Sequence, residues 1–275
     1  MHNTHLLITF FLFSILALPA FASNELTFCE SEECVTPLKR TPHIVAIDPA
    51  VSYLRRTKEG GTTQTGLLYG IRGSYDYIKR YKPFFEVQAS IELGSLKGHT
   101  KTNALHSKWQ DEMAEANLGY TLQYKMSPYY SFTPFIGGGY MREANRFTGK
   151  EAIQLKFITA FPYLSCGFLS SVCFENGLRI GLNFRVKTPW DINCKVENDP
   201  EYKHISLIVN EKQHYRAEMP ISYHKTLLCG TIEMGIAPYY ELRQYGRREN
   251  YPFDFLKTKI ELIGCYTQFI YRFRL

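Results

Sequence analysis

The sequence predicts an all-β protein, an antiparallel up-and-down β-barrel of about ten strands that crosses a membrane. Three observations lead to this fold class. Bulky and polar residues alternate in many segments, an apolar run of export-signal length lies near the N-terminus, and short and long connections alternate along the chain. Alternation with period two places one set of side chains on each face of a strand, which suits a wall with lipid outside and a polar interior.

The first 22 residues have the composition of a cleaved export signal. A nearly continuous apolar run at 6–18 is followed by Pro19 and the small-x-small site Ala20-Phe21-Ala22, so we expect cleavage after Ala22. The run is too short to cross a membrane as a helix, and no second apolar stretch of about 20 residues follows it. The predicted domains are therefore a signal peptide at 1–22, a periplasmic N-terminal segment at 23–42 and a barrel at 43–275.

Five segments alternate strictly and are predicted to be strands. They are 67–77, 85–94, 116–125, 178–187 and 232–241. Five further strands with a less regular pattern are predicted near 44–56, 132–142, 154–168, 215–224 and at the C-terminus. The glycines at 137–139 indicate a bulge or a close approach within one of them. In the last strand, Ile260 and Leu262 fall on the otherwise polar face, which predicts a bulge or a strand that continues above the membrane.

The connections set the topology. Short turns are predicted at 79–82, 125–128, 171–176 and 225–228, and longer polar loops at 58–65, 97–112, 143–151, 188–214 and 246–254. Such alternation is typical of a barrel whose two termini lie on the periplasmic side. Five outer loops and four inner turns give ten strands. If residues 215–240 belonged to a loop, the barrel would have eight.

The composition adds one signal. The charged and hydrophobic fractions, 21% and 45%, are ordinary for a globular protein, whereas 20 Tyr residues stand against only two Trp residues. Tyrosines spread through the chain suit the aromatic girdles at the two surfaces of a membrane. A tyrosine-rich soluble β-sandwich is the alternative.

The last strand resembles the closing strand of bacterial outer-membrane β-barrel proteins. Its bulky residues recur at alternate positions: Phe269, Tyr271, Phe273 and Leu275. The resemblance implies an outer-membrane location and recognition of this strand by the barrel assembly machinery. The last residue in that superfamily is usually Phe or Trp, whereas this chain ends in Leu275.

The alternation assigns charged residues of both signs to the inward face. They are Arg72, Asp76, Glu86, Glu92, Arg179, Arg185, Lys187, Arg216, Glu218, Glu233 and Glu241. A lone buried charge is costly, so we expect these groups to pair with one another and fill the lumen. A narrow pore lined by the same charges is the alternative.

Small outer-membrane barrels also include enzymes. The omptin proteases place acidic residues and a histidine near the outer rim, and His99, His106 and Asp111 share a predicted loop here. Nothing in their spacing distinguishes them from solvated polar residues.

A second enzyme family, the lipid A deacylases, uses a His-x-Ser motif with a later glutamate. His204, Ser206 and Glu218 resemble that arrangement and are the candidate catalytic residues. In that family the motif lies on a strand and is followed by Asn, whereas Leu207 follows here within a predicted loop. The sequence therefore favours a non-enzymatic role.

Seven cysteines are unusual for this kind of barrel. In an oxidising compartment Cys29 with Cys34, and Cys166 with Cys173, are candidate disulfides. The odd number leaves a thiol for an intermolecular bond, in analogy with envelopes stiffened by cross-linked cysteine-rich proteins. Alternatively, most of the cysteines are small apolar fillers. No C-x-x-C pair and no His/Cys cluster at zinc spacing occurs in the sequence, so neither a metal site nor a cofactor is predicted.

The net charge of +6 does not indicate a nucleic-acid partner, because Lys and Arg alternate with carboxylates. Arg247 and Arg248 in the last outer loop are candidates for contact with lipopolysaccharide phosphates or host polyanions. We therefore expect an outer-membrane protein with a structural or surface-contact, adhesin-like role. Its expected partners are outer-membrane lipid, the assembly machinery, and disulfide-linked envelope proteins or a host surface. A narrow pore and an outer-leaflet hydrolase are the alternatives.

Overall fold

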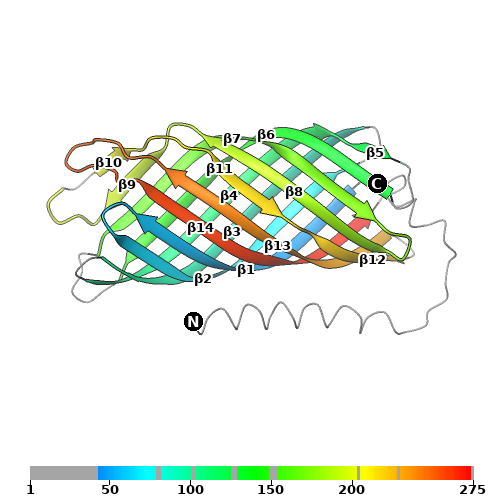
Figure 1. The fold of residues 1–275 in the computed structure, drawn as a ribbon, viewed down its shortest axis with the longest axis horizontal. Helices are drawn as coiled ribbons and strands as arrows, with labels where there is room; N and C mark the ends of the chain where they lie inside the picture. Colours follow the sequence, from blue (N-terminus) through cyan, green and yellow to red (C-terminus); the bar gives the residue numbers. More distant parts are fainter. Residues whose placement is uncertain are drawn as a thin grey trace. The chain divides into compact units, whose positions relative to one another are not determined.

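The computed structural model describes residues 43–78, 82–100, 103–124, 129–148, 154–202, 205–227 and 230–273. Their regular structure is β-strand, and the strands form one sheet closed into a barrel (Figure 1). No helix among these residues is long and apolar enough to span a membrane. The predicted signal peptide and N-terminal segment lie outside the described residues.

The strands are β1 (His43–Lys58), β2 (Thr62–Tyr77), β3 (Pro83–His99), β4 (Ala104–Tyr120), β5 (Leu122–Tyr124), β6 (Tyr129–Phe147), β7 (Lys156–Cys173), β8 (Leu178–Pro189), β9 (Asn193–Glu197), β10 (Ile205–Ile208), β11 (His214–Glu218), β12 (Ile221–Leu227), β13 (Gly230–Tyr245) and β14 (Thr258–Phe273).

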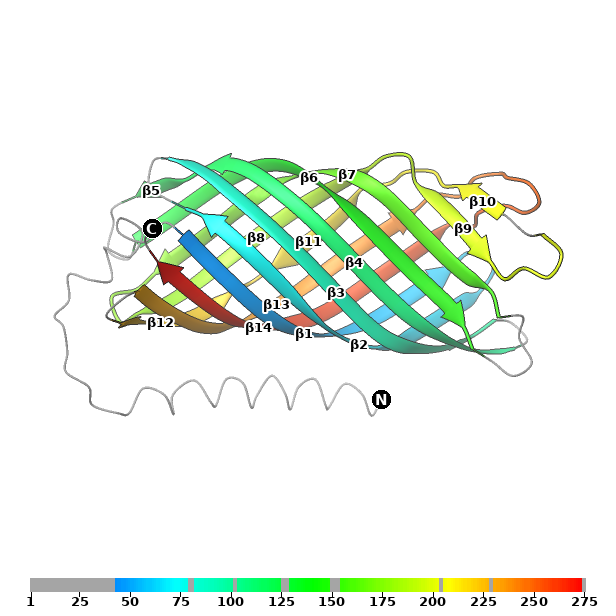
Figure 2. The same cartoon turned by 180° about the vertical axis from the view of Figure 1, so that it is seen from behind.

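Ten antiparallel strands form the wall, which confirms the predicted fold class. We call each of them a stave, because two of the ten consist of two strands in line. β4 and β5 make one stave, because both pair with β6 in a single register. β11 and β12 make another between β8 and β13, interrupted at Met219 and Pro220. β14 pairs with β1 and closes the ring. β9 and β10 pair as a hairpin, and β9 also pairs with the first residues of β7 (Figure 2).

The register fixes the tilt of the strands. Paired residues followed once around the wall lead from His43 to Arg55 on the same strand, a shift of 12 residues (55 minus 43). With about 3.3 Å per residue and about 4.8 Å between strands, this shift inclines the strands by about 40° to the barrel axis. The 16 residues of β1 then rise about 40 Å, more than the apolar band of about 25 Å that such barrels present to lipid.

The two ends of the barrel differ. We call the end where β1 begins and β14 ends the terminal end, and the opposite end, which carries the β9–β10 hairpin, the loop end (right and left in Figure 1). Connections at the loop end include 59–61 and 246–257, and those at the terminal end include 174–177. Outward residues near this end are polar, as at Arg55 on β1 and Gln110 on β4, so the strand extensions beyond the apolar band lie at the loop end. The two longest connections between neighbouring strands of the wall, 190–213 and 246–257, also lie there.

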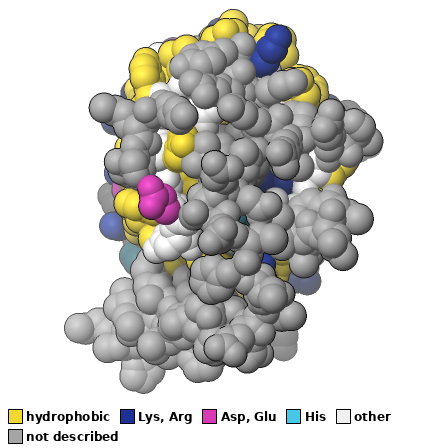
Figure 3. All heavy atoms as spheres, turned by 90° about the vertical axis from the view of Figure 1, so that its right-hand side faces the viewer, with side chains coloured by type: hydrophobic (Ala, Val, Ile, Leu, Met, Phe, Trp, Pro, Cys, Tyr) yellow, Lys and Arg dark blue, Asp and Glu magenta, His cyan; other side chains and the backbone are white. Residues whose placement is uncertain are grey.

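Apolar side chains cover the outer surface of the wall. Leu118, Ile136 and Leu164 are more than half exposed, and hydrophobic side chains are visible around the outline of the barrel when it is viewed toward the terminal end (Figure 3). Exposed tyrosines lie near the terminal ends of their strands, as at Tyr120 and Tyr271, and at a second level in mid-strand. A continuous apolar surface of this extent suits lipid and not water.

Two predicted loops are shorter than expected. β3 and β4 extend through most of the predicted loop 97–112, and β9 and β10 lie within the predicted loop 188–214. Beyond the apolar band the outward residues become polar, as Gln110 does on β4, so alternation of apolar and polar residues no longer marks a strand. The loop assignment at 97–112 was wrong for this reason. The assignment at 188–214 was also wrong, although β9 alternates, with Cys194 and Val196 buried between polar residues, over only five residues.

The last strand contains no bulge. β14 keeps one register with β13 and one with β1 over its whole length. Ile260 and Leu262 point inward and belong to a buried apolar cluster at the loop end that includes Leu54, Leu68 and Trp109. Of the two predicted explanations for the apolar residues on this face, the bulge was wrong, and the strand instead continues past the apolar band.

The three glycines of β6 allow close contacts and not a bulge, because the registers with β4 and β7 are unbroken. A Cβ atom at Gly137 would lie 2.1 Å from Oδ1 of Asn117, and one at Gly139 would lie 2.6 Å from the Tyr163 hydroxyl oxygen. These glycines therefore leave room for polar side chains that cross the lumen from neighbouring strands.

Candidate functional site

The lumen contains a network of buried charges, and Arg216 on β11 lies at its centre. Its Nε donates to Oε1 of Glu218 at 2.6 Å, its Nη1 to Oε2 of Glu241 at 2.7 Å, and its Nη2 to the Tyr266 hydroxyl at 2.8 Å. All four side chains are buried. Each of the three nitrogen atoms of this guanidinium thus donates a hydrogen bond, and the acceptors lie on β11, β13 and β14.

Aromatic rings and guanidinium groups stack beside this centre. The ring centroids of Tyr239 and Tyr266 lie 4.9 Å apart in a stacked arrangement. Arg216 Cζ lies 4.3 Å from the Tyr239 centroid, and Arg72 Cζ lies 3.9 Å from the Tyr266 centroid. Desolvated cation–π contacts of this kind add to the ion pairs. Arg72 also donates to Asp48 at 2.8 Å and to Glu218 at 3.1 Å.

The network continues toward the loop end through Arg243 on β13. Its Nε donates to Glu241 and its Nη1 to Oε1 of Glu143, both at 2.8 Å, and Nη1 also forms an ion pair with Oδ2 of Asp111 at 2.7 Å. Nζ of Lys187 lies 3.6 Å from Oε1 of Glu241. β13 and β4, which carry Arg243 and Asp111, are opposite staves of the ring, so this ion pair spans the lumen.

A second branch is built around Arg185 on β8. It donates to Oε1 of Glu115 at 2.6 Å and to Oε1 of Glu86 at 2.8 Å. Asn117 donates to both carboxylates, and the Tyr163 hydroxyl donates to Oε2 of Glu115 at 2.8 Å. β8 lies four staves from β3, which carries Glu86, so this branch also crosses the lumen.

Glu92 on β3 joins the two sides at mid-height. The Ser52 hydroxyl donates to its Oε2 at 2.6 Å, and the Tyr239 hydroxyl donates to its Oε1 at 3.0 Å. Charged hydrogen bonds in a dry interior are strong only when each group has its partners. Most of the charged groups at the centre of the lumen have such partners.

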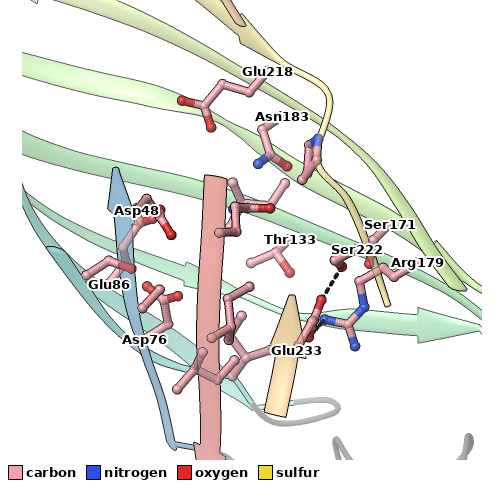
Figure 4. Close-up of a pocket in the computed structure, with 18 of the residues that line it drawn as sticks. Asp48, Asp76, Glu86, Thr133, Ser171, Arg179, Asn183, Glu218, Ser222 and Glu233 are labelled. Atoms are coloured by element: carbon pink, nitrogen blue, oxygen red, sulfur yellow. Dashed lines mark hydrogen bonds and ion pairs between the residues drawn. The ribbon is translucent and has the colours of Figure 1, made fainter. Parts of the chain in front are cut away.

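Near the terminal end the lumen contains a polar cavity of about 160 Å³. Glu233 accepts hydrogen bonds there from Ser222 and from Arg179 at 3.3 Å (Figure 4), and it pairs with Arg272 at 2.7 Å. Asp76 also lines the cavity, and its Oδ1 has no hydrogen-bond partner among the described residues. Figure 4 shows carboxylates from several staves converging on this space.

Near the loop end a second cavity of about 310 Å³ lies under the loops. Its walls are mostly apolar and aromatic, and they include Trp109, Phe157 and Phe255. Arg56 and Lys58 of β1 also line it. The ion-paired network lies between the two cavities, and the buried apolar cluster forms part of the wall of the loop-end cavity.

The structure places every predicted lumen residue on the inward face. Eleven charged residues were predicted there, and all except Asp76 have a hydrogen-bond or ion-pair partner described above. Sequence reasoning missed six others that complete the network: Asp48, Asp111, Glu115, Glu143, Arg243 and Arg272. Several of the six lie beyond the strand limits predicted from the sequence. Extending the same period-two pattern past those limits would have found them.

The candidate catalytic residues are not assembled. Glu218 is buried in the lumen, where Arg72 and Arg216 bind its carboxylate. Ser206 is exposed on β10, and its hydroxyl donates to Oδ1 of Asn193 at 2.7 Å. His204 lies outside the described residues. The structure therefore does not bring Ser206 and Glu218 together.

The omptin-like group is also separated. Asp111 is buried in the lumen and pairs with Arg243. His99 and His106 are exposed near the ends of β3 and β4. Within the described ranges, no group of His, Cys, Asp and Glu is arranged to hold a metal ion.

The predicted disulfide between Cys166 and Cys173 is wrong, because both cysteines are free and lie on the same strand, β7. Seven residues of strand separate them by about 23 Å, whereas a disulfide requires Cα atoms about 4.4–6.8 Å apart. Cys194 and Cys265 are also free and buried, and burial raises the pKa of the Cys194 thiol. Cys29 and Cys34 lie outside the described residues.

No family model matches the sequence, and no curated protein matches it as a relative. Solved structures do match the fold. The outer-membrane protease OmpT from Escherichia coli has a TM-score of 0.52 at 8% identity, over 84% of this chain and 96% of that one. The translocator domain of the autotransporter NalP from Neisseria meningitidis has a TM-score of 0.44 at 10% identity, over 88% and 93%. The chain thus has the fold of bacterial outer-membrane β-barrels, and at this identity the likeness concerns the fold alone.

Proposed function

We propose that the chain is a bacterial outer-membrane protein whose closed barrel serves a structural or surface-contact role in the cell envelope. The ion pair between Arg243 and Asp111, which joins opposite staves through the lumen, is the observation that carries this proposal. A lumen filled in this way favours a rigid scaffold over a conduit. A narrow pore is the alternative, and it would require these bonds to open.

The loop end supports the surface-contact role. Tyr251 is 84% exposed, and Ile208 on β10 is also exposed, although both lie beyond the apolar band. The rings of Tyr202 and Tyr251 lie 6.4 Å apart, so the loop after β9 contacts the loop before β14. Exposed apolar side chains outside the lipid-facing band suit contact with a partner.

Charge at the loop end gives a second means of contact. Arg247 is exposed and bound to Asp254 at 3.0 Å, and its neighbour Arg248 is exposed as well. We infer that lipopolysaccharide phosphates or host polyanions are partners of this surface. The barrel assembly machinery and disulfide-linked envelope proteins are further proposed partners.

An outer-leaflet hydrolase is a weaker candidate. Its support is the fold likeness to a protease, whereas Ser206 and Glu218 lie apart and Glu218 is bound by two arginines. No observation at the loop end favours this function over surface contact.

The surface-contact role is tested by bacteria that display the protein. We expect Tyr251→Ser combined with Ile208→Ser to lower adherence to a host-cell monolayer severalfold, because it removes the exposed apolar side chains. Tyr124→Ser is the matched control, since Tyr124 is exposed at the terminal end. Adherence is counted as bound bacteria at equal amounts of barrel in the outer membrane.

Two outcomes would contradict the proposal. Equal adherence of the double variant and the parent would remove the surface-contact role. If, in addition, deletion of the whole protein left the envelope equally impermeable to large antibiotics, the structural role would also fail.

A further inference from the structure

The loop-end cavity contains two cationic side chains without an ion pair. Arg56 and Lys58 are successive inward residues of β1 and are partly exposed within the cavity. Neither forms an ion pair with a described residue. Arg56 donates to Oε1 of Gln64 at 2.9 Å, and Nζ of Lys58 lies 5.6 Å from the Phe157 centroid and 5.9 Å from the Phe255 centroid.

The acidic residues that line the cavity are already bound by other groups. Glu143 accepts hydrogen bonds from Arg243 and Tyr245, both at 2.8 Å. Asp254 pairs with Arg247 at 3.0 Å. Asp199 accepts hydrogen bonds from two backbone N–H groups of its own loop, both at 2.9 Å. These contacts leave the positive charge of Arg56 and Lys58 without a direct counter-ion from the cavity walls.

Two buried polar atoms on the walls also have no partner. Among the described residues, no hydrogen bond reaches Nε1 of Trp109 or Oδ1 of Asn145, although both residues are only 3% exposed. Each of these atoms is closed off from the cavity space by its neighbours, so neither of them identifies the ligand.

The rest of the wall is apolar or aromatic. The residues of this kind are Trp109, Leu155, Phe157, Leu207, Tyr245, Phe253, Phe255, Leu256 and Ile260. The volume of about 310 Å³ lies at the lower end of the range for small-molecule sites, about 300–1,000 Å³. A mostly apolar pocket with a few convergent donors is the usual form of such a site.

We propose that this cavity is a binding site for a small organic anion with an apolar body. Its negatively charged oxygens would accept hydrogen bonds from Arg56 and Lys58, while its apolar body would lie against Phe157 and Phe255. The proposal goes beyond the surface-contact role and does not depend on it.

The test uses octanoate as the anion and octanamide as its neutral counterpart of similar size. The protein is held in lipid nanodiscs, and empty nanodiscs correct for partitioning into the bilayer. Trp190→Phe leaves Trp109 as the single tryptophan, so its fluorescence reports binding in the cavity. We expect octanoate to change this fluorescence saturably with a Kd at least tenfold lower than that of octanamide.

Variants then assign the preference to the cations. Lys58→Met should remove most of the tenfold preference for octanoate, and Lys58→Arg should keep it. Arg55→Gln is the matched control, because Arg55 is the neighbour of Arg56 on β1 but points outward. Circular dichroism and the boiling-dependent gel shift check that each variant is folded.

The proposal is overturned if octanoate and octanamide bind the parent equally, or if neither binds at millimolar concentration. Those two results need no variant, so they hold even if Lys58→Met does not fold. An unchanged preference in folded Lys58→Met would also overturn it. Adherence of whole cells is a separate measurement, and its outcome leaves these results unaffected.

Discussion

At the scale of single residues, Arg216 connects four lumen side chains that come from three strands. Its guanidinium binds Glu218, Glu241 and Tyr266 and stacks on Tyr239. Arginine suits this position because its planar group offers five donors in a fixed geometry. A lysine there could bind one of these partners well but not all of them.

Replacement of Arg216 should therefore be costly. We expect Arg216→Met to lower the free energy of unfolding by about 3–5 kcal/mol, because Glu218 and Glu241 would lose a buried partner. Arg142→Met is the control, since its ion pair with Glu112 is about one-third exposed and should contribute about 0–1 kcal/mol. Urea unfolding of the two variants in lipid vesicles gives the comparison. Similar losses for both would mean that the buried network does not stabilise the barrel.

At the scale of elements, β6 shows how a strand can be adapted to the side chains of its neighbours. Gly137 and Gly139 keep its inward face free of side chains where Asn117 and Tyr163 approach. Tyr163 reaches Glu115 past this gap. The glycines weaken β6 as an isolated strand, and the hydrogen bonds made across it offset that loss.

A methyl group at Gly139 should disturb this arrangement. We expect Gly139→Ala to destabilise the barrel by about 1–3 kcal/mol, because the added Cβ would overlap the ring of Tyr163. Gly73→Ala is a matched control, since a Cβ at Gly73 would have no neighbour within 4 Å. The midpoints of urea unfolding are compared at equal lipid composition. Equal midpoints for the two variants would show that the gap at Gly139 is not needed.

The elements also show what the sequence could predict. Strands inside the apolar band were recognisable, because lipid on one side and polar groups on the other impose alternation on segments such as 67–77 and 178–187. At the loop end this constraint ends, since Gln110 is polar on the outside while Trp109 and Ile260 are apolar on the inside. Strand ends such as those of β3 and β4 were missed for this reason, whereas β9 alternates but is only five residues long.

The candidate sites could also be predicted only in part. The alternation of inward and outward residues was enough to list the inward charges, but not to predict their partners. The contact between Arg243 and Asp111 can be predicted only if the ring of ten staves and the shift of 12 residues are known. The loop-end cavity had no sequence signal, since it combines residues from eight strands, β1, β4, β6, β7, β9, β10, β13 and β14, and from three connections.

At the scale of the whole molecule, the filled lumen should prevent ion flow. We expect the purified protein to give no stable current steps in a planar bilayer, because bonds such as Arg243 with Asp111 span the interior. The double variant Arg243→Ala with Arg216→Ala should show steps if it folds, since it opens the centre of the network. Steady conductance of the parent protein would instead favour the narrow pore.

The pairing of β1 with β14, which closes the barrel, also bears on how the protein is synthesised and folded. Its pairs include His43 with Phe273, the first and last described residues. A chain without the sixteen residues of β14 would leave β1 and β13 with unpaired edges. Such edges bind other chains readily. Closure must therefore await synthesis and export of β14, and the cell has to keep the more than two hundred residues that precede it from aggregating until that moment.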